Sequence, residues 1–135
     1  MTRVYLIRHG ETAWNKELKY QGHTDTALSE AGLRQAWLVA ERLAREKIDA
    51  VYTSDLSRAF VTAKAIADRH GLDVTVVPEF REMNFGHWEG LTYEGIVARW
   101  PEEYELLFYK TDEVRVPGGE TFRELKERAA GAVAR

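Results

Sequence analysis

The sequence predicts an α/β fold in which a mostly parallel sheet lies between two layers of helices. Three short apolar runs rich in β-forming residues, at 4–7, 48–52 and 74–77, alternate with segments of helical apolar periodicity. This strand–helix–strand order is typical of parallel strands joined by right-handed crossovers. With 135 residues, and no repeat or linker in sight, the chain is expected to form one domain over residues 1–135.

The two helices between these runs are predicted from apolar spacing and from residues that begin and end helices. Ser29 is expected to begin the first helix, and Asp55 is a plausible N-cap for the second. The second helix should end at Gly71, because glycine readily adopts the left-handed conformation that closes a helix. One face of the first helix is expected to be apolar and to carry Leu33, Ala36, Trp37, Ala40, Leu43 and Ala44.

The second half of the chain is predicted to contain three further helices. Thr92 is expected to cap a helix that ends near residue 100, and Pro101 to start another that runs through residue 108. Thr121 and Glu124 have the spacing of a capping box at the head of the last helix. Since an α/β chain usually returns such a helix to another strand, and none follows here, we expect the domain to be incomplete at its C-terminus.

Composition excludes several classes of function. The net charge of −3 gives no general attraction to nucleic acids or anionic membranes, so neither is an expected partner. The absence of cysteine excludes disulfides, thiolate metal sites and a cysteine nucleophile. No apolar stretch approaches the ~20 residues that span a bilayer, and no signal peptide is visible. We therefore expect a soluble, cytoplasmic protein.

Charged residues follow the predicted strands at the points where these end. Arg8 and His9 follow the first strand, Arg58 lies in the first turn of the helix after the second, and Glu82 follows the third. Ligands of open parallel sheets bind at the carboxyl ends of the strands, so these side chains are expected to meet. Guanidinium groups suit phosphate, a neutral imidazole can attack phosphorus, and a carboxyl group can protonate the leaving alkoxide. The pattern indicates phosphoryl transfer.

Several blocks of the sequence, in order, resemble the histidine phosphatase superfamily, the phosphoglycerate-mutase-like proteins. The blocks cover essentially the whole chain and read RHGETAWN, YQGHTDTALSEAGLRQA, TSDLSRAFVTA, REMNFGHWEG and PGGET. The resemblance implies a phosphoglycerate-mutase-like fold. It also implies that His9 is the phosphorylated nucleophile, that Arg8 and Arg58 bind the phosphoryl group and that Glu82 is the proton donor. The residues that it places on the substrate side of the pocket are Asn15, Gln21 and Gly22.

The family has a second histidine on a later strand, and this chain has no histidine after His87. We therefore expect an incomplete member, and a catalytically impaired phosphate-binding fragment stays an alternative. The resemblance implies a phosphomonoester hydrolase that uses no metal or cofactor, similar to small bacterial phosphatases for α-ribazole 5′-phosphate or of broad specificity. A phosphoglycerate mutase is the runner-up, although the segment between Glu82 and Glu120 looks short for one. A homodimer is possible.

A few residues have competing interpretations. Glu79 and Glu89 are alternative acids, although the register of the motif favours Glu82. His23 and Asp25 could suggest a metal pair, but a solvated turn is the better interpretation because further ligands are missing. His87 could touch the substrate or lie on a loop surface, and Trp88 is the tryptophan most expected to form a pocket wall.

Overall fold

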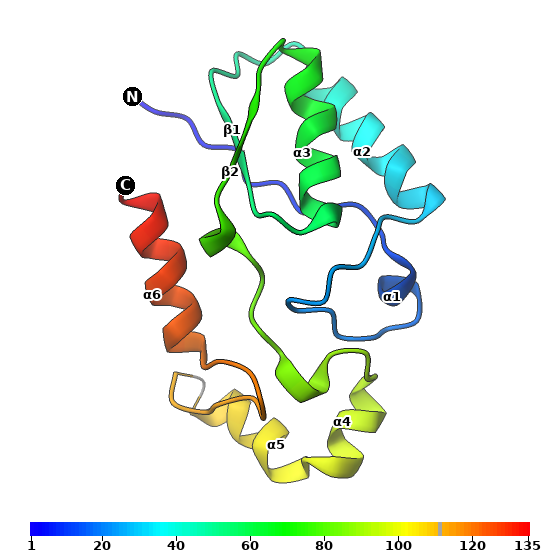
Figure 1. The fold of residues 1–135 in the computed structure, drawn as a ribbon, viewed down its shortest axis with the longest axis vertical. Coiled ribbons are helices and arrows are strands. Elements are labelled where there is room, and N and C mark those ends of the chain that lie inside the picture. Colours follow the sequence, from blue (N-terminus) through cyan, green and yellow to red (C-terminus); the bar gives the residue numbers. More distant parts are fainter. Residues whose placement is uncertain (111) are drawn as a thin grey trace.

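The structure is a computed structural model that describes residues 1–110 and 112–135. Short strands and helices alternate in its first half, and helices follow in its second half (Figure 1). In chain order the elements are α1 (Ala13–Lys16), α2 (Glu30–Leu43), β1 (Val51–Thr53), α3 (Ser57–Arg69), β2 (Val74–Val76), the short helices η1 (Pro78–Phe80) and η2 (Gly86–Trp88), α4 (Tyr93–Arg99), α5 (Pro101–Tyr109) and α6 (Phe122–Val133).

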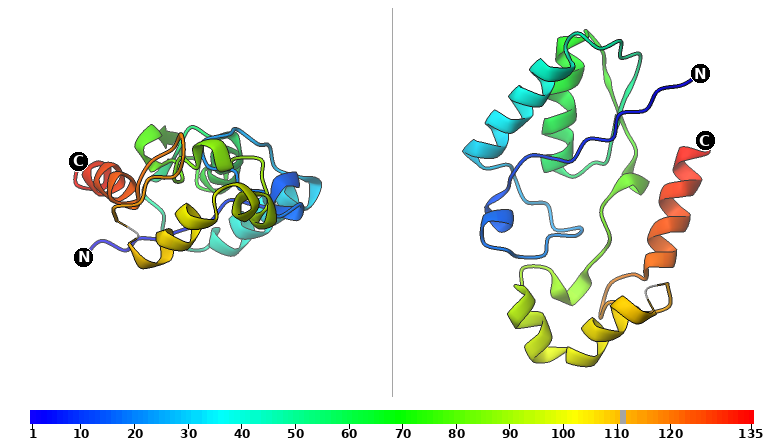
Figure 2. Two further views of the ribbon diagram at one scale, coloured as in Figure 1. Left: turned by 90° about the horizontal axis from the view of Figure 1, so that it is seen from below. Right: turned by 180° about the vertical axis from the view of Figure 1, so that it is seen from behind.

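The strands β1 and β2 are parallel, as predicted, with Val51 opposite Val74 and Thr53 opposite Val76. Helix α3 connects them and packs against both, and α2 packs on α3. Helix α6 lies on the other side of the strands, next to η1, as the views in Figures 1 and 2 agree. The α/β fold class is confirmed. None of the helices in residues 1–110 and 112–135 is both long and apolar enough to cross a membrane.

The predicted strand at residues 4–7 is wrong. This segment is extended but forms no ladder with another described strand, and its Val4 and Leu6 side chains are 71% and 92% exposed. A strand exists only where a neighbour supplies hydrogen bonds, which an apolar run cannot guarantee. The other two strands are shorter than their apolar runs, because only 51–53 and 74–76 pair with each other.

The helix boundaries follow the predicted caps with one correction. The Ser29 side chain accepts a hydrogen bond from the N–H of Gly32 at the head of α2, and Gly71 adopts a φ of +62° after α3. Asp55 does not cap α3. The carboxylate of Asp25 instead accepts from the N–H of Ser57 at 2.8 Å, so the cap comes from a distant loop.

The predicted apolar face of α2 is only partly buried. Ala36, Ala40 and Leu43 lie in the interior, whereas Leu33 and Trp37 are 52% and 58% exposed. The small alanines let α2 approach α3 closely, and the larger side chains lie at the edge of that contact. Helical spacing predicts which residues share a face, but not how wide the covered part of that face is.

The second half of the chain has a core of its own. Helices α4 and α5 begin after Thr92 and at Pro101 as predicted, and Thr121 caps α6 by accepting from the N–H of Glu124. The capping box is incomplete there, because the Glu124 carboxylate pairs with Arg115. Trp88 does not form a pocket wall. It is fully buried in this core with Met83, Ile96, Leu107 and Val116.

Candidate active site

The structure gathers the predicted site residues around one cavity of about 450 Å³. It lies at the carboxyl ends of the 4–7 segment and β1, at the start of α3. Six of the seven predicted residues line it, namely Arg8, His9, Asn15, Gln21, Arg58 and Glu82. The seventh, Gly22, takes part through its backbone carbonyl, which accepts a hydrogen bond from Arg58.

The His9 ring is fixed in one tautomer by its own backbone. Its Nδ1 lies 2.6 Å from the carbonyl oxygen of Gly10. A carbonyl can only accept, so Nδ1 carries the hydrogen and Nε2 has a free lone pair. Burial lowers the pKa of His9, the Gly10 carbonyl opposes this, and the nearby positive charges of Arg58 and Arg8 lower it further. The net pKa lies below the ordinary value, so the ring is neutral at pH 7.

The backbone beside His9 is held by close contacts with two helices. A Cβ on Gly10 would lie 2.4 Å from the carbonyl oxygen of Gly32 in α2, so no larger residue fits. The N–H of Gly10 donates to Thr62 Oγ1 at 3.2 Å, and that hydroxyl donates to the carbonyl of Arg58 at 2.8 Å. Thr62 therefore ties the backbone next to His9 to the helix that carries Arg58.

Arg58 is 1% exposed and its guanidinium is oriented by backbone carbonyls. Nη1 donates to the carbonyl of Thr24 at 2.7 Å, and Nη2 donates to that of Gly22 at 2.6 Å. Nη2 also donates to a carboxylate oxygen of Glu82 at 3.2 Å. The guanidinium of Arg58 is thus fixed in place, and its Nη2 atom also contacts Glu82, the predicted proton donor.

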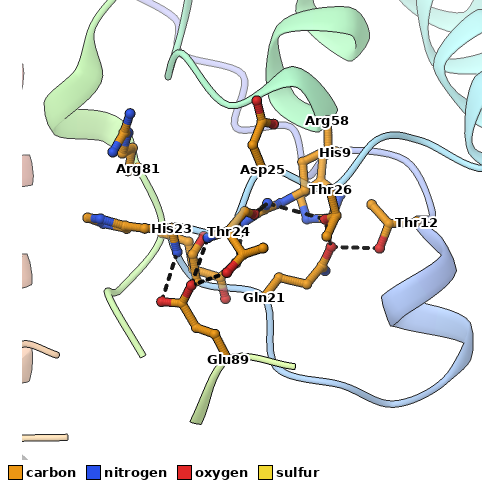
Figure 3. Close-up of polar contacts among 12 residues, drawn as sticks. His9, Thr12, Gln21, His23, Thr24, Asp25, Thr26, Arg58, Arg81 and Glu89 are labelled. Carbon is orange, nitrogen blue, oxygen red and sulfur yellow. Dashed lines mark hydrogen bonds and ion pairs between the residues drawn. The ribbon is translucent and has the colours of Figure 1, made fainter. Parts of the chain in front are cut away.

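The loop that accepts these bonds, residues 21–26, is itself held by side chains on both sides (Figure 3). Glu89 accepts from the N–H groups of His23 at 3.2 Å and Thr24 at 2.8 Å, and from the Thr24 hydroxyl. Gln21 Oε1 accepts from the hydroxyls of Thr12, at 2.6 Å, and Thr26. The Gln21 amide nitrogen is thereby the part of that side chain left for a ligand.

Asn15 and Arg8 complete the lining of the cavity. Asn15 forms the capping box of α1, where its Oδ1 accepts from the N–H of Thr12 at 2.9 Å. Its amide nitrogen is therefore the group that could contact a substrate. Arg8 is exposed and adds a second positive charge beside His9.

The three candidate acids differ in their surroundings and in the groups that they contact. The Glu82 carboxylate is 45% exposed and lines the cavity. Glu89 is committed to the loop at 21–26, as described, and Glu79 pairs with Arg135 at 3.2 Å. Of the three, Glu82 is the acid that reaches the same space as His9.

The weaker metal interpretation finds no support in the geometry. Asp25 caps α3, and the Nε2 atom of His23 is buried with no hydrogen-bond partner among the residues that the structure describes. Within the described part of the chain, no three histidine, aspartate or glutamate side chains come together as metal ligands. His87 stacks on Trp100, with ring centroids 6.3 Å apart, and does not line the cavity.

Sequence reasoning missed Thr62 and Thr12, whose hydroxyls hold the backbone of Gly10 and the side chain of Gln21 beside the cavity. Thr62 lies one helical turn after Arg58, a spacing that places two residues on one helix face and could have pointed to it. Thr12 contacts Gln21, nine residues further along the chain, and carries no comparable local signal. The cavity as a whole holds two guanidiniums and one carboxylate, so it favours an anion beside a neutral imidazole.

Comparison with known sequences identifies the family of this chain. Residues 4–135 match the family model of the histidine phosphatase superfamily (branch 1). The chain is 44% identical over 135 residues to phosphoglycerate mutase-like protein 4 of Arabidopsis thaliana, and 39% identical over 133 residues to a probable phosphoglycerate mutase of Yersinia pestis. The matches cover 98% of this chain but 59% and 62% of those relatives, so the chain spans about three fifths of their length.

Solved structures give the same result for the fold. A putative alpha-ribazole-5′-P phosphatase from Escherichia coli superposes with a TM-score of 0.87 at 32% identity, over 96% of this chain and 64% of that one. A mycobacterial glucosyl-3-phosphoglycerate phosphatase in complex with VO3 superposes with a TM-score of 0.86 at 36% identity, over 93% and 60%. The fold is thus phosphoglycerate-mutase-like, and with a family match across nearly its full length this chain belongs to the histidine phosphatase superfamily.

Proposed function

We propose that this chain carries the catalytic residues of a phosphomonoester hydrolase that works through a phosphohistidine. The observation that supports this best is the fixed tautomer of His9, whose Nδ1–H is held by Gly10 in a cavity shared with Arg8 and Arg58. An imidazole with a free Nε2 lone pair beside two guanidiniums is suited to attack phosphorus.

The proposed reaction has two steps. In the first, His9 Nε2 forms a bond to phosphorus while the ester P–O bond breaks, and the leaving oxygen takes a proton from Glu82. In the second, water attacks the phosphohistidine and gives its proton to Glu82, the N–P bond breaks and His9 is regenerated. Arg8 and Arg58 neutralise the phosphoryl oxygens in both steps, which is the main task in phosphoryl transfer.

The contact between Arg58 and Glu82 fits an exchange on substrate binding. A phosphoryl oxygen would take over the Nη2 hydrogen that Glu82 accepts at 3.2 Å in this structure. The other Arg58 bonds, to the carbonyls of Gly22 and Thr24, can persist and keep the guanidinium aimed. Substrate binding thereby releases the Glu82 carboxyl for the leaving group, at no cost in Arg58 orientation.

Intact-mass spectrometry of the chain after a rapid alkaline quench tests the function, since alkali preserves phosphohistidine. With p-nitrophenyl phosphate as substrate, we expect a species heavier by one phosphoryl group, release of inorganic phosphate, and loss of both in His9→Gln. Removal of metals with EDTA should leave turnover unchanged. Phosphate release without a phosphorylated His9 would contradict the proposed mechanism.

The substrate is proposed to be a small phosphomonoester, and the names of the structural neighbours suggest where to start. The panel should contain α-ribazole 5′-phosphate, sugar phosphates, nucleotides and aryl phosphates. A strong preference for α-ribazole 5′-phosphate would assign that activity, whereas similar kcat/KM across the panel would assign a phosphatase of broad specificity.

The names of the sequence relatives keep a mutase as the second candidate. A mutase transfers the phosphoryl group between positions of phosphoglycerate and depends on a bisphosphoglycerate primer, whereas a hydrolase releases phosphate without one. Primer dependence would therefore favour the mutase. A His9 that becomes phosphorylated without turnover would favour the impaired phosphate-binding fragment.

A further inference from the structure

The loop that carries Glu82 is held on its side away from the cavity by Arg128 of α6. Its Nη1 donates to the carbonyls of Glu79 at 2.6 Å and Arg81 at 2.7 Å, and its Nη2 donates to that of Glu82 at 2.8 Å. Three carbonyls within four consecutive residues thus converge on one guanidinium. Because the planar fork fixes the directions of its N–H bonds, it fixes the path of this backbone as well.

Glu120 forms the other half of this arrangement. Its carboxylate accepts from Arg128 Nη2 at 2.6 Å and Nε at 3.2 Å, and from the N–H of Asn84 at 2.7 Å. The N–H of Glu120 also donates to the carbonyl of Asn84 at 3.0 Å. Arg128 therefore holds the loop at residues 79–82, while Glu120 holds it at residue 84.

The pair is mostly withdrawn from solvent, with the side chain of Glu120 12% and that of Arg128 22% exposed. Burial by itself would raise the pKa of Glu120, but the hydrogen bonds from Arg128 and Asn84 more than offset this, and the pKa is lowered. Glu120 is thus a carboxylate at neutral pH, and the pair stays charged. Neither side chain lines the cavity, so neither can contact the substrate there.

The backbone that follows the loop is also in close contact with the segment before α6. A Cβ on Gly119 would lie 2.2 Å from the carbonyl oxygen of Asn84. With this contact, the distance between the loop and the start of α6 is set by main-chain atoms and has little freedom to change.

We propose that Arg128 and Glu120 act as positioning residues for Glu82, fixing where its carboxyl stands when the leaving oxygen departs. The inference rests on the proposed role of Glu82 as proton donor. In this structure the carboxyl also takes a hydrogen bond from Arg58, but a bound phosphoryl group would occupy that donor. When a phosphoryl group occupies that donor, the position of the Glu82 side chain depends on its backbone. Three of the hydrogen bonds that fix this backbone come from Arg128.

The leaving group of the substrate distinguishes a positioning role from a merely structural one, because a structural defect would lower kcat/KM on all substrates alike. An alkoxide needs a proton as it leaves, whereas p-nitrophenolate is stable enough to leave without one. A misplaced acid therefore slows attack on alkyl phosphates and spares p-nitrophenyl phosphate. The parameter kcat/KM covers the steps up to P–O cleavage, so later hydrolysis of the phosphohistidine does not mask the effect.

The experiment compares kcat/KM for glycerol phosphate and p-nitrophenyl phosphate in Arg128→Lys, Glu120→Gln and Glu82→Gln. The ratio of the two values is independent of how much of each preparation is folded. Glu82→Gln should lower the alkyl-to-aryl ratio by roughly 10²-fold, and Arg128→Lys and Glu120→Gln by about tenfold or more. Arg123→Lys, the same change at an exposed position of α6, is the matched control and should leave the ratio unchanged.

The possible failures are distinguishable. Equal losses on both substrates in Arg128→Lys, or no loss on either, with a clear ratio change in Glu82→Gln, would overturn the positioning role alone. An unchanged ratio in Glu82→Gln would overturn the assignment of the acid, and with it the inference. A chain without any phosphoryl transfer would overturn the proposed function itself.

Discussion

Two arginines of this chain donate to backbone carbonyls in the same way, yet we propose different roles for them. Arg58 binds the carbonyls of Gly22 and Thr24 and pairs with a half-exposed acid on the cavity wall. Arg128 binds three carbonyls and pairs with the mostly buried Glu120. The partner of Arg128 is withdrawn from solvent, whereas the partner of Arg58 is half-exposed and lines the cavity, where an anionic ligand could displace it. We therefore expect Arg58, and not Arg128, to bind an anion.

The largest expected difference between the two arginines is in anion binding. Arg58→Lys keeps the charge but loses the planar fork, so we expect kcat/KM for p-nitrophenyl phosphate to fall by about 10²–10³-fold. Inhibition by inorganic phosphate should weaken in parallel. In Arg128→Lys, inhibition by phosphate should stay close to that of the parent chain. Steady-state kinetics with phosphate as inhibitor measures both, and equal weakening in the two variants would remove the distinction.

The next difference concerns the carboxylate partners and the stability of the fold. Glu120→Gln leaves Arg128 with a poorer partner, so the free energy of unfolding should fall by about 1–3 kcal/mol. Glu82→Gln changes a half-exposed side chain whose amide oxygen can still accept from Arg58, so it should lower the free energy of unfolding less, by about 1 kcal/mol or under. Urea titration at pH 7 measures both values.

The pH dependence of stability tests how much the charge of Glu120 contributes to the fold. Because the pKa of Glu120 is lowered in the folded chain, its contribution to stability is present above its ordinary value of 4.5 and is lost as the pH falls below that value. The loss of stability between pH 5 and more acidic conditions should therefore be smaller in Glu120→Gln than in the parent chain. A parallel decline in both would mean that Glu120 contributes nothing through its charge.

A smaller effect is expected at the cap of α3, the helix that carries Arg58. Asp25→Ala removes the acceptor for the N–H of Ser57 and should cost about 1 kcal/mol of unfolding free energy. Asp55→Ala removes a surface pair with Arg81 and should cost less than that. Thermal unfolding of both variants tests the order, and a larger loss in Asp55→Ala would show that the cap is unimportant for the fold.

The smallest expected effect is a shift in the titration of His9. Its pKa should lie below the ordinary value of 6.5, so activity that needs the neutral ring should rise with pH through that lower value. Arg8→Gln removes a positive charge beside the ring and should raise the pKa. Arg123→Lys, at an exposed position that does not line the cavity, should leave it unchanged. NMR titration with His9→Gln as the assignment control measures this shift, and a pKa above 6.5 in the parent chain would contradict the picture of a neutral nucleophile.

The sequence predicted that Arg58 and the other candidate residues meet at one cavity, because strand order and strand ends bring them together. Arg8, His9, Arg58 and Glu82 each follow a predicted strand closely, and parallel topology brings such positions to one edge. Residues 4–7 form no strand, but the path of this segment still brings His9 to the cavity. The family resemblance added Asn15 and Gln21, which pattern alone does not single out.

The Arg128 side could not be predicted in the same way. Its acceptors are backbone carbonyls, which every residue possesses, so they leave no trace in the sequence. Asp25 shows the same difficulty, because a cap supplied from a distant loop cannot be told from the adjacent Asp55 by local rules. Trp37 is exposed because the contact of α2 with α3 covers a part of the apolar face of α2, and the width of such a contact depends on tertiary structure.

The close approach of Gly10 to Gly32 has a consequence for engineering. At Gly32, a methyl group would lie 2.0 Å from the carbonyl oxygen of Glu11, two residues beyond His9. Any side chain introduced there must push apart the main chain that aims His9, although position 32 belongs to a helix and looks like a safe place to diversify. A library meant to alter substrate preference should therefore leave it untouched and vary the cavity wall, for example at Phe80 and Phe85.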